Sequence, residues 1–212
     1  MKRLGTVEEL TAALAAGPTQ WLAIANPYGE LFPTAGDFRA TLGQVRDYVE
    51  RGGSWWETAG YSLYIALTQE GGAWKSTPVG SSGMATLGLP VGGGEVDQPA
   101  EPLTVTPTGR TVLGAELAAR VEATSSSVNR GLPRGSDDPG HVALVAGARQ
   151  DFIGAYRLNG WGYFWRIGGF GPNPDVALPV AVAAMEYVFD HPPLPIEGGG
   201  VSYLWHVKAT TE

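Results

Sequence analysis

The sequence predicts an α/β fold: a three-layer sandwich in which helices cover both faces of a mainly parallel sheet, with a C-terminal antiparallel hairpin. Residues 21–25 form a continuous apolar run, which is typical of a parallel strand that is covered on both faces. Helical and strand patterns alternate as far as Ser62. Asn159 and Gly160 lie between two aromatic segments, and an Asn-Gly pair in this position favours a tight hairpin turn.

The amino-terminal part of the chain contains two predicted helices and a second predicted strand. Thr6 and Glu9 have the spacing of a capping box, and an apolar stripe follows them at helical spacing up to a Gly-Pro pair. Asp37 is placed to cap a second helix. A short aromatic strand is expected over residues 54–58, and residues 59–62 then form a sharp turn. Polar groups that follow the strands would line a cleft.

The middle of the chain is dominated by Gly, Pro and Ser. We expect a loop or an insertion over residues 71–107, with one short strand over residues 103–106. Apolar positions between Val112 and Val121 predict a further helix. Residues 125–140 indicate a polar linker.

The carboxyl-terminal third combines strands and one helix. Residues 142–147 predict a strand, and residues 151–167 predict the two strands of the hairpin. A Gly-rich loop follows, after which Asp175 is placed to cap the last helix. Residues 201–207 predict one more strand.

Composition restricts the classes of function. The chain has 212 residues, enough for one sizeable core, so we expect a single domain over residues 1–212. The formal net charge of −7 argues against nucleic acid as a partner. No apolar run reaches the ~20 residues of a membrane helix, and the first residues lack the apolar core of a signal peptide. We therefore expect a soluble chain with no membrane partner.

The chain has no cysteine, which excludes disulfides, thiolate metal sites and cysteine nucleophiles. Its histidines, His141, His191 and His206, do not form a paired metal-ligand motif. The sequence therefore predicts no metal site and no cofactor, and it leaves the cellular compartment undetermined.

Eight residues are candidates for ligand binding because they lie where predicted elements meet: Asn26, Tyr28, Glu30, Glu57, Tyr61, Ser62, Asn173 and Asp175. Three of them are also catalytic candidates. Ser62 would act as a nucleophile if a base approached it, and its alternative role is a helix cap. Glu30 and Glu57 would form an acid/base pair if they met across a cleft. The alternative is that Glu30 is solvated and that Glu57 pairs with an arginine such as Arg46 or Arg39.

Aromatic residues gather near the turn and in the hairpin, where they alternate with polar residues. Rings interspersed with polar groups suit the faces of sugars. Because side chains alternate between the two faces of a strand, about half of the hairpin aromatics are expected in the core and the others at the surface.

The order of elements over residues 6–190 resembles that of the class I glutamine amidotransferase-like superfamily, which includes trehalose-utilisation-type and biotin-ligase amino-terminal-type domains. Gly60-Tyr61-Ser62 lies where these proteins have a Gly-x-Cys turn that opens a helix, and Asn173-Pro174-Asp175 lies where they have a His-x-Glu-type pair. The resemblance implies a flavodoxin-like sheet. It also implies that glutaminase activity is absent here, because neither the cysteine nor the histidine is present at the matching positions.

The leading hypothesis is therefore an amidotransferase-like domain that lacks the cysteine nucleophile and binds a small polar ligand, with carbohydrate as one candidate, or serves as a module of a larger protein. The rival hypothesis is a hydrolase that uses Ser62 or the pair Glu30 and Glu57 in the same cleft. A third is a purely structural module whose aromatic cleft is filled by its own loops.

Overall fold

The computed structural model describes residues 2–26, 30–34, 36–58, 61–80, 82–89, 102–124, 132–133, 141–148, 150–157, 162–167 and 174–190. The helices in these ranges are α1 (Val7–Ala16), α2 (Phe38–Glu50), α3 (Ser82–Thr86), α4 (Pro107–Glu122) and α5 (Pro174–Asp190). The strands are β1 (Ala23–Asn26), β2 (Leu31–Pro33), β3 (Ser54–Thr58), β4 (Ile65–Glu70), β5 (Ala73–Pro78), β6 (Thr104–Val105), β7 (Leu132–Pro133), β8 (Val142–Ala146), β9 (Gln150–Arg157) and β10 (Tyr163–Ile167).

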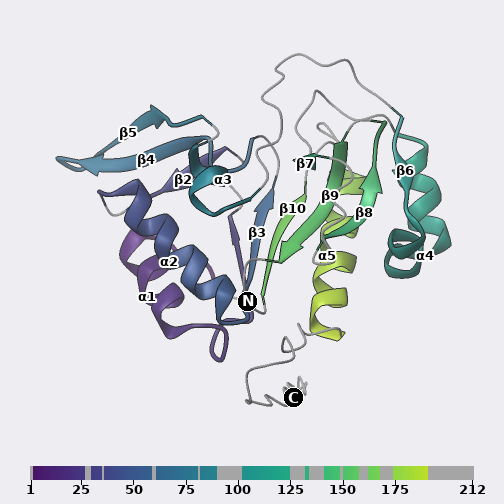
Figure 1. Ribbon diagram of the computed structural model, residues 1–212, viewed down its shortest axis with the longest axis horizontal. Coiled ribbons are helices and arrows are strands. Elements are labelled where there is room, and N and C mark those ends of the chain that lie inside the picture. Colours follow the sequence, from purple (N-terminus) through teal and green to yellow (C-terminus); the bar gives the residue numbers. More distant parts are fainter. Residues whose placement is uncertain are drawn as a thin grey trace.

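The larger sheet is mixed and has the strand order β1-β3-β10-β9-β8-β6, with β7 paired to β9 (Figure 1). β1, β3 and β10 run parallel to one another. The other pairs in this sheet are antiparallel. The prediction of a mainly parallel sheet is therefore wrong. The sheet is mixed because β9 and β10 form the expected antiparallel hairpin within it. Only β10 of this pair can then run parallel to β3.

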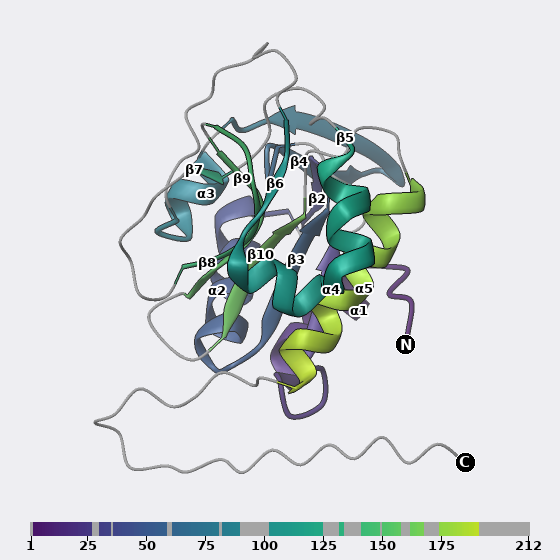
Figure 2. The same cartoon turned by 90° about the vertical axis from the view of Figure 1, so that its right-hand side faces the viewer.

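Helices cover both faces of this sheet, as the sequence predicts. On one face α1, α2 and α3 pack over β1 and β3 in a core that includes Leu14, Leu42, Trp55 and Phe164. On the other face α4 and α5 pack over β3, β10 and the antiparallel strands (Figure 2). The structure is thus α/β with two apolar cores separated by one sheet.

The two amino-terminal helices begin at the predicted caps. The Thr6 hydroxyl accepts from the Glu9 backbone N–H (3.2 Å), and the Asp37 carboxylate accepts from the backbone N–H groups of Arg39 and Ala40 (2.8 and 3.2 Å). These bonds satisfy donors that a helix start leaves without intrahelical partners. The last helix differs from the prediction, because α5 begins at Pro174 and Asp175 lies inside its first turn instead of capping it.

A second, three-stranded sheet has the order β2-β4-β5. β4 and β5 form a hairpin whose turn contains Gly71 and Gly72, both with positive φ. The expectation of a loop or insertion over residues 71–107 is therefore wrong for β5 and α3. The sequence does not indicate β5, because all six of its residues are exposed and the strand lacks the apolar alternation of a half-buried strand.

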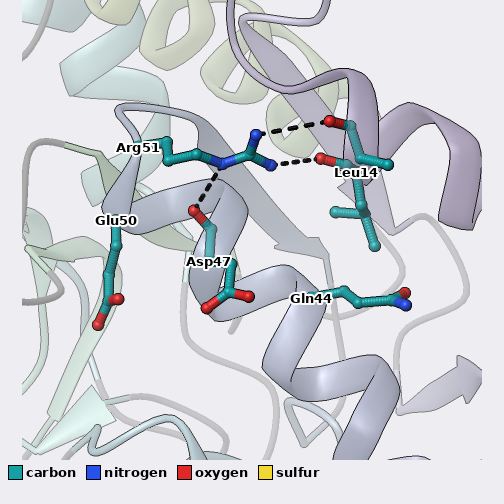
Figure 3. A pocket seen from close by; sticks show the side chains of 6 residues that line it. Leu14, Gln44, Asp47, Glu50 and Arg51 are labelled. Atoms are coloured by element: carbon teal, nitrogen blue, oxygen red, sulfur yellow. Dashed lines mark hydrogen bonds between the residues drawn. The ribbon is translucent and has the colours of Figure 1, made fainter.

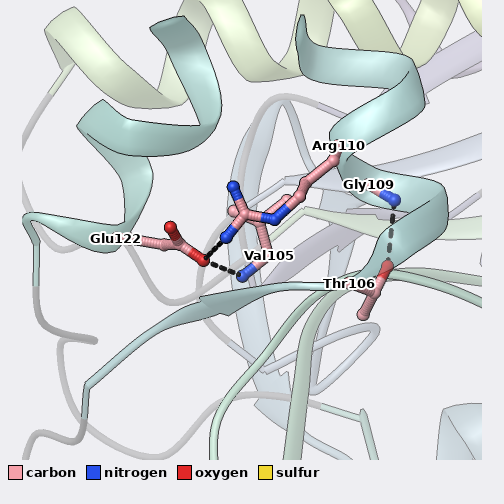
Figure 4. Close-up of polar contacts among 5 residues, drawn as sticks. All are labelled: Val105, Thr106, Gly109, Arg110 and Glu122. Carbon is pink, nitrogen blue, oxygen red and sulfur yellow. Dashed lines mark hydrogen bonds and ion pairs between the residues drawn. The ribbon is translucent and has the colours of Figure 1, made fainter. Parts of the chain in front are cut away.

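The helix α4 contains a break and is held to β6 by a polar contact. Gly114 has φ 73° and ψ 166°, which interrupts the helical backbone. Beyond the break, the Glu122 carboxylate accepts from the Val105 backbone N–H (3.1 Å) and from Arg110 (2.6 Å) (Figure 4). The bond from Val105 is the main reason that the pKa of Glu122 is lowered. These contacts fix both halves of α4 at the edge of the larger sheet.

The remaining predicted elements have mixed outcomes. Strands at residues 103–106 and 142–147 and the helix between Val112 and Val121 are confirmed by β6, β8 and α4. The Asn159-Gly160 turn and the strand over residues 201–207 lie outside the described residues. No helix in the described ranges is both long and apolar enough to cross a membrane.

Candidate functional site

Three polar residues lie at one level of the larger sheet, near the carboxyl ends of its parallel strands. Asn26 on β1 is in register with Glu57 on β3, and Glu57 is in register with Arg166 on β10. Residues in register on neighbouring strands point to the same face. Because Trp55, two residues before Glu57, belongs to the core under α1 and α2, all three side chains point toward that face. All three are buried.

The Glu57 carboxylate is hydrogen-bonded by two neutral donors. The Trp55 indole Nε1–H donates to Oε1 (2.7 Å), and the Asn26 Nδ2–H donates to Oε2 (3.1 Å) and more weakly to Oε1 (3.3 Å). Asn26 also donates to the Leu31 carbonyl (2.9 Å), which links β1 to the start of β2. The Glu57 carboxylate therefore ties together the strand ends at this edge of the sheet.

The charge of Glu57 is disfavoured by its surroundings. Burial raises the pKa of Glu57 to about 8, against the lowering effects of the Trp55 hydrogen bond, the Arg166 charge and the Asn26 hydrogen bond. Desolvation outweighs these three effects because the side chain is 0% exposed. A carboxyl group with such a pKa is mostly protonated at neutral pH and can donate as well as accept hydrogen bonds.

The turn after β3 differs from the one the resemblance implies. Residues 61–64 lead into β4 and not into a helix. Leu63 has a φ of 55°, a left-handed conformation that is uncommon for a leucine. The helix α3 packs closely against the backbone of Leu63, because a Cβ added to Gly83 would lie 2.6 Å from the Leu63 carbonyl oxygen. This packing holds Leu63 in its left-handed conformation. The strain therefore falls on Leu63, one residue after the predicted nucleophile.

Ser62 is buried at 8% exposure, and its hydroxyl has no hydrogen-bond partner in the described structure. It is not a helix cap, because the helix it would cap is absent there. A nucleophilic serine needs a base within hydrogen-bond reach. The described contacts of Ser62 include none, so this arrangement does not amount to a triad.

The other predicted residues are placed less completely. Tyr28 and Asn173 lie outside the described residues, and for Asp175 only the backbone position in α5 is described. Glu30 is half-buried and lies directly before β2, in the smaller sheet, where its carbonyl accepts from the Ile65 backbone N–H (2.9 Å). Asn26 and Glu57 are the two predicted residues that the described contacts bring together.

The predicted aromatic surface is only partly present. Trp55, Trp56, Phe164 and Trp165 belong to the two cores, while Tyr163 is half-buried. Tyr61 and Tyr64 are also half-buried, and their ring centroids lie 5.1 Å apart. Tyr61 and Tyr64 are therefore the pair of partly exposed aromatic rings that lies beside the turn.

Arg166 and Trp55 are functional candidates that sequence reasoning missed. Arg166 stands in an aromatic strand, and nothing local distinguishes it from a solvated charge. Only the parallel register of β10 with β3 places it opposite Glu57. The apolar neighbours Trp165 and Ile167 are compatible with a buried arginine but do not by themselves indicate one.

A separate depression of about 530 Å³ lies between α1 and the end of α2, where Leu14, Ala15, Gln44, Asp47, Glu50 and Arg51 line it (Figure 3). Arg51 donates to the Leu14 carbonyl (2.7 Å) and to the Asp47 carbonyl (3.1 Å). Arg51 therefore satisfies the Leu14 carbonyl, which the end of α1 leaves without an intrahelical partner, and also bonds a carbonyl of its own helix α2. Because Arg51 precedes β3, this depression lies at the end of the sheet away from Glu57, and its polar contacts are explained by helix capping.

Comparison with known proteins gives no family assignment: no family model matches this sequence, and no curated protein matches it significantly. Among the described residues, no group of three His, Asp or Glu side chains is placed to hold a metal ion.

Proposed function

We propose that the protein is an amidotransferase-like domain without thiol chemistry that binds a small polar ligand, such as a sugar, at the carboxyl ends of β1, β3 and β10. The observation that carries the proposal is the buried Glu57 carboxyl group, joined to Asn26 and facing Arg166 on neighbouring parallel strands. Parallel strands place ligands at their carboxyl ends because the chain segments leaving them diverge. Buried polar clusters of this kind often add no more stability than well-packed apolar residues would, which favours a role for this one beyond stability.

Glu57 is the positioning residue of this site. It is covered by protein, and it holds Asn26 and the edge of β1 relative to β3. The strands β1, β3 and β10 end at Asn26, Thr58 and Ile167, next to the level of the sheet at which Glu57 lies. A change at Glu57 is therefore expected to alter the positions of all three strand ends. The half-buried rings of Tyr61 and Tyr64, next along the chain, supply apolar surface of the kind that packs on sugar rings.

Thermal melts with a panel of mono- and disaccharides test the proposal. We expect at least one sugar to raise the melting temperature of the native protein. Glu57→Gln keeps the shape and keeps one acceptor oxygen for Trp55 and Asn26, while the Asn26 bond to Oε2 is lost. The variant is expected to keep most of the stability at neutral pH while reducing the sugar-induced shift. Arg46→Gln is the matched control, because its partly buried pair with Glu50 lies on α2 away from the strand ends. A Glu57→Gln protein with a lowered melting temperature and an unchanged sugar response would leave Glu57 with a structural role only.

A hydrolase that uses Ser62 is the second candidate, and its support is the buried hydroxyl without a partner. Such a serine is expected to react with a fluorophosphonate probe and to lose the label in Ser62→Ala. Glutamine-dependent ammonia release is expected to stay at background, because the chain has no cysteine to form a thioester. Labelling at background in the native protein would eliminate this candidate.

A further inference from the structure

The outer edge of the smaller sheet is formed by β5, which pairs with β4 on one side and, among the described residues, with no strand on the other. All six residues of β5 are exposed, and its one aromatic residue, Trp74, is 52% exposed. Figure 1 shows the hairpin of β4 and β5 extending from the rest of the molecule, with β5 on its outer side. An exposed strand edge is a template on which another strand can pair.

The hydrogen bonds of β4 determine which backbone groups of β5 point outward. Successive residues of a strand direct their N–H and C=O groups to alternate sides. The Tyr64 carbonyl accepts from the Val79 N–H (2.9 Å), on the β5 side, while the Ile65 N–H donates to the Glu30 carbonyl (2.9 Å), on the β2 side. The even-numbered residues of β4 therefore direct their backbone groups toward β5.

Two residues of β5 direct their backbone groups away from the sheet. In the antiparallel register, Ala73, Lys75 and Thr77 lie opposite even-numbered residues of β4, so their N–H and C=O groups point toward β4. The N–H and C=O groups of Trp74 and Ser76 consequently point the other way. Two donors and two acceptors with this spacing match the hydrogen bonds of one added strand.

One face of the smaller sheet adds apolar surface beside this edge. Residues in register share a face, so Trp74 lies on the face opposite to that of the buried residues Phe32 and Ala66. The apolar residues on the Trp74 face are all exposed or half-buried: Leu31, Pro33, Ile65, Leu67, Trp74 and Pro78. A strand added to β5 would continue this face and lay alternate side chains beside Trp74.

The charge of Lys75 indicates which kind of strand fits. Two copies of β5 that paired antiparallel through both Trp74 and Ser76 would place their Lys75 side chains directly opposite each other. Like charges in this position are destabilising, and a lysine on an edge strand opposes self-association. The ion pair of Lys75 with Glu70 (3.5 Å) is exposed and contributes little. A carboxylate on the added strand, opposite Lys75, is therefore the favourable partner.

We propose that β5 is a docking edge for an extended acidic segment of a partner protein, which adds a strand to the smaller sheet. The segment bonds through its backbone to Trp74 and Ser76 and places an Asp or Glu side chain opposite Lys75. The apolar side chains on either side of that acidic residue lie on the Trp74 face. This surface does not depend on the function proposed at the strand ends of the larger sheet.

Nuclear magnetic resonance titration with the capped peptide Thr-Val-Glu-Val-Thr tests this proposal, in about 0.15 M salt, where charges more than about 8 Å away are screened. We expect the backbone amide resonances of Trp74 and Ser76 to move together and to saturate, because their N–H groups gain acceptors. The amides of Ala73 and Thr77, which point toward β4, are expected to move less. A peptide with Lys in place of Glu is expected to bind about two- to fivefold more weakly, the range of one exposed ion pair.

Two substitutions separate strand addition from nonspecific contact with Trp74. Lys75→Glu is expected to reverse the preference, so that the Lys peptide binds more tightly than the Glu peptide. Ser76→Pro removes an outward N–H and no bond to β4, and it is expected to raise the midpoint of the Glu peptide at least about threefold. Ser76→Thr keeps the N–H and is the matched control, with an unchanged midpoint.

Three results of the titrations would overturn the proposal: Trp74 and Ser76 amides that stay in place with both peptides, equal binding of the two peptides, or a preference that Lys75→Glu leaves unchanged. A shift of the same resonances with protein concentration alone, with a dimer mass in sedimentation, would also overturn it, because a second copy would then occupy the edge. The titrations of the native protein decide the question even if Ser76→Pro fails to fold.

Discussion

At the scale of single residues, the distinctive feature of this protein is a carboxyl group held inside the sheet by neutral donors. Glu57 accepts from Trp55 and Asn26, while Arg166 acts on it through its charge. Hydrogen bonds to a buried carboxylate usually favour the ionised form, but here complete burial outweighs them. The protonation state of Glu57 is therefore set by desolvation.

This balance predicts a pH dependence of stability. The pKa of Glu57 is raised from its ordinary value of 4.5 to about 8 in the folded protein. Between these two values the unfolded state binds fewer protons than the folded state, so the contribution of Glu57 to the free energy of unfolding is largest below pH 4.5 and falls as pH rises through 8.

Urea unfolding of the native protein and of Glu57→Gln at pH 5, 7 and 9 measures this effect. The variant cannot ionise at this position, so its stability relative to the native protein is expected to increase with pH. A difference in free energy that stays constant across the three pH values would show that the folded pKa of Glu57 is close to that of the unfolded chain.

At the scale of elements, the parallel strands are brought together by close backbone contacts at their amino ends. The Gly162 N–H donates to the Val49 carbonyl (3.0 Å), and the Tyr163 N–H donates to the Gly53 carbonyl (3.1 Å). A Cβ on Gly162 would clash with the carbonyl oxygens of Gly53 and Val49. Only glycine therefore allows β10 to approach the end of α2 and the start of β3.

Gly162→Ala is expected to destabilise the protein by about 3 kcal/mol or more, because the obstacle is backbone and cannot move as a side chain would. Gly43→Ala in α2 is the matched control. A Cβ there meets nothing within 4 Å, so this change is expected to stabilise by about 0.5–1 kcal/mol through helix propensity. Chemical denaturation of both variants gives the two free energies. Similar stabilities for both variants would contradict the tight contact at Gly162.

At the scale of the whole molecule, one mixed sheet separates two apolar cores, and the candidate site faces the core under α1 and α2. Trp55 and Glu57 point toward the α1 and α2 side, while Trp56 points toward the α4 and α5 side. The alternation of side chains along the single strand β3 therefore distributes the Glu57 carboxyl group and the Trp56 ring to opposite faces. β3 contributes to both cores because it lies between β1 and β10 in the sheet.

The sequence by itself determined the local elements. The caps at Thr6 and Asp37, the strand over residues 54–58 and the aromatic hairpin follow from patterns within a few residues of one another. Asn26 and Glu57 were also found from sequence, because each lies at the end of a predicted strand and polar residues there line the same edge.

The tertiary structure alone decided how these elements combine. The parallel pairing of β10 with β3 makes the sheet mixed and sets Arg166 opposite Glu57. This pairing depends on contacts between residues more than a hundred positions apart. Strand register is fixed by packing and by close approaches such as Gly162 against Gly53, and neither leaves a local signal. The exposed strand β5 and the buried rings of Trp56 and Trp165 depend on tertiary packing, which is a property of the folded chain as a whole.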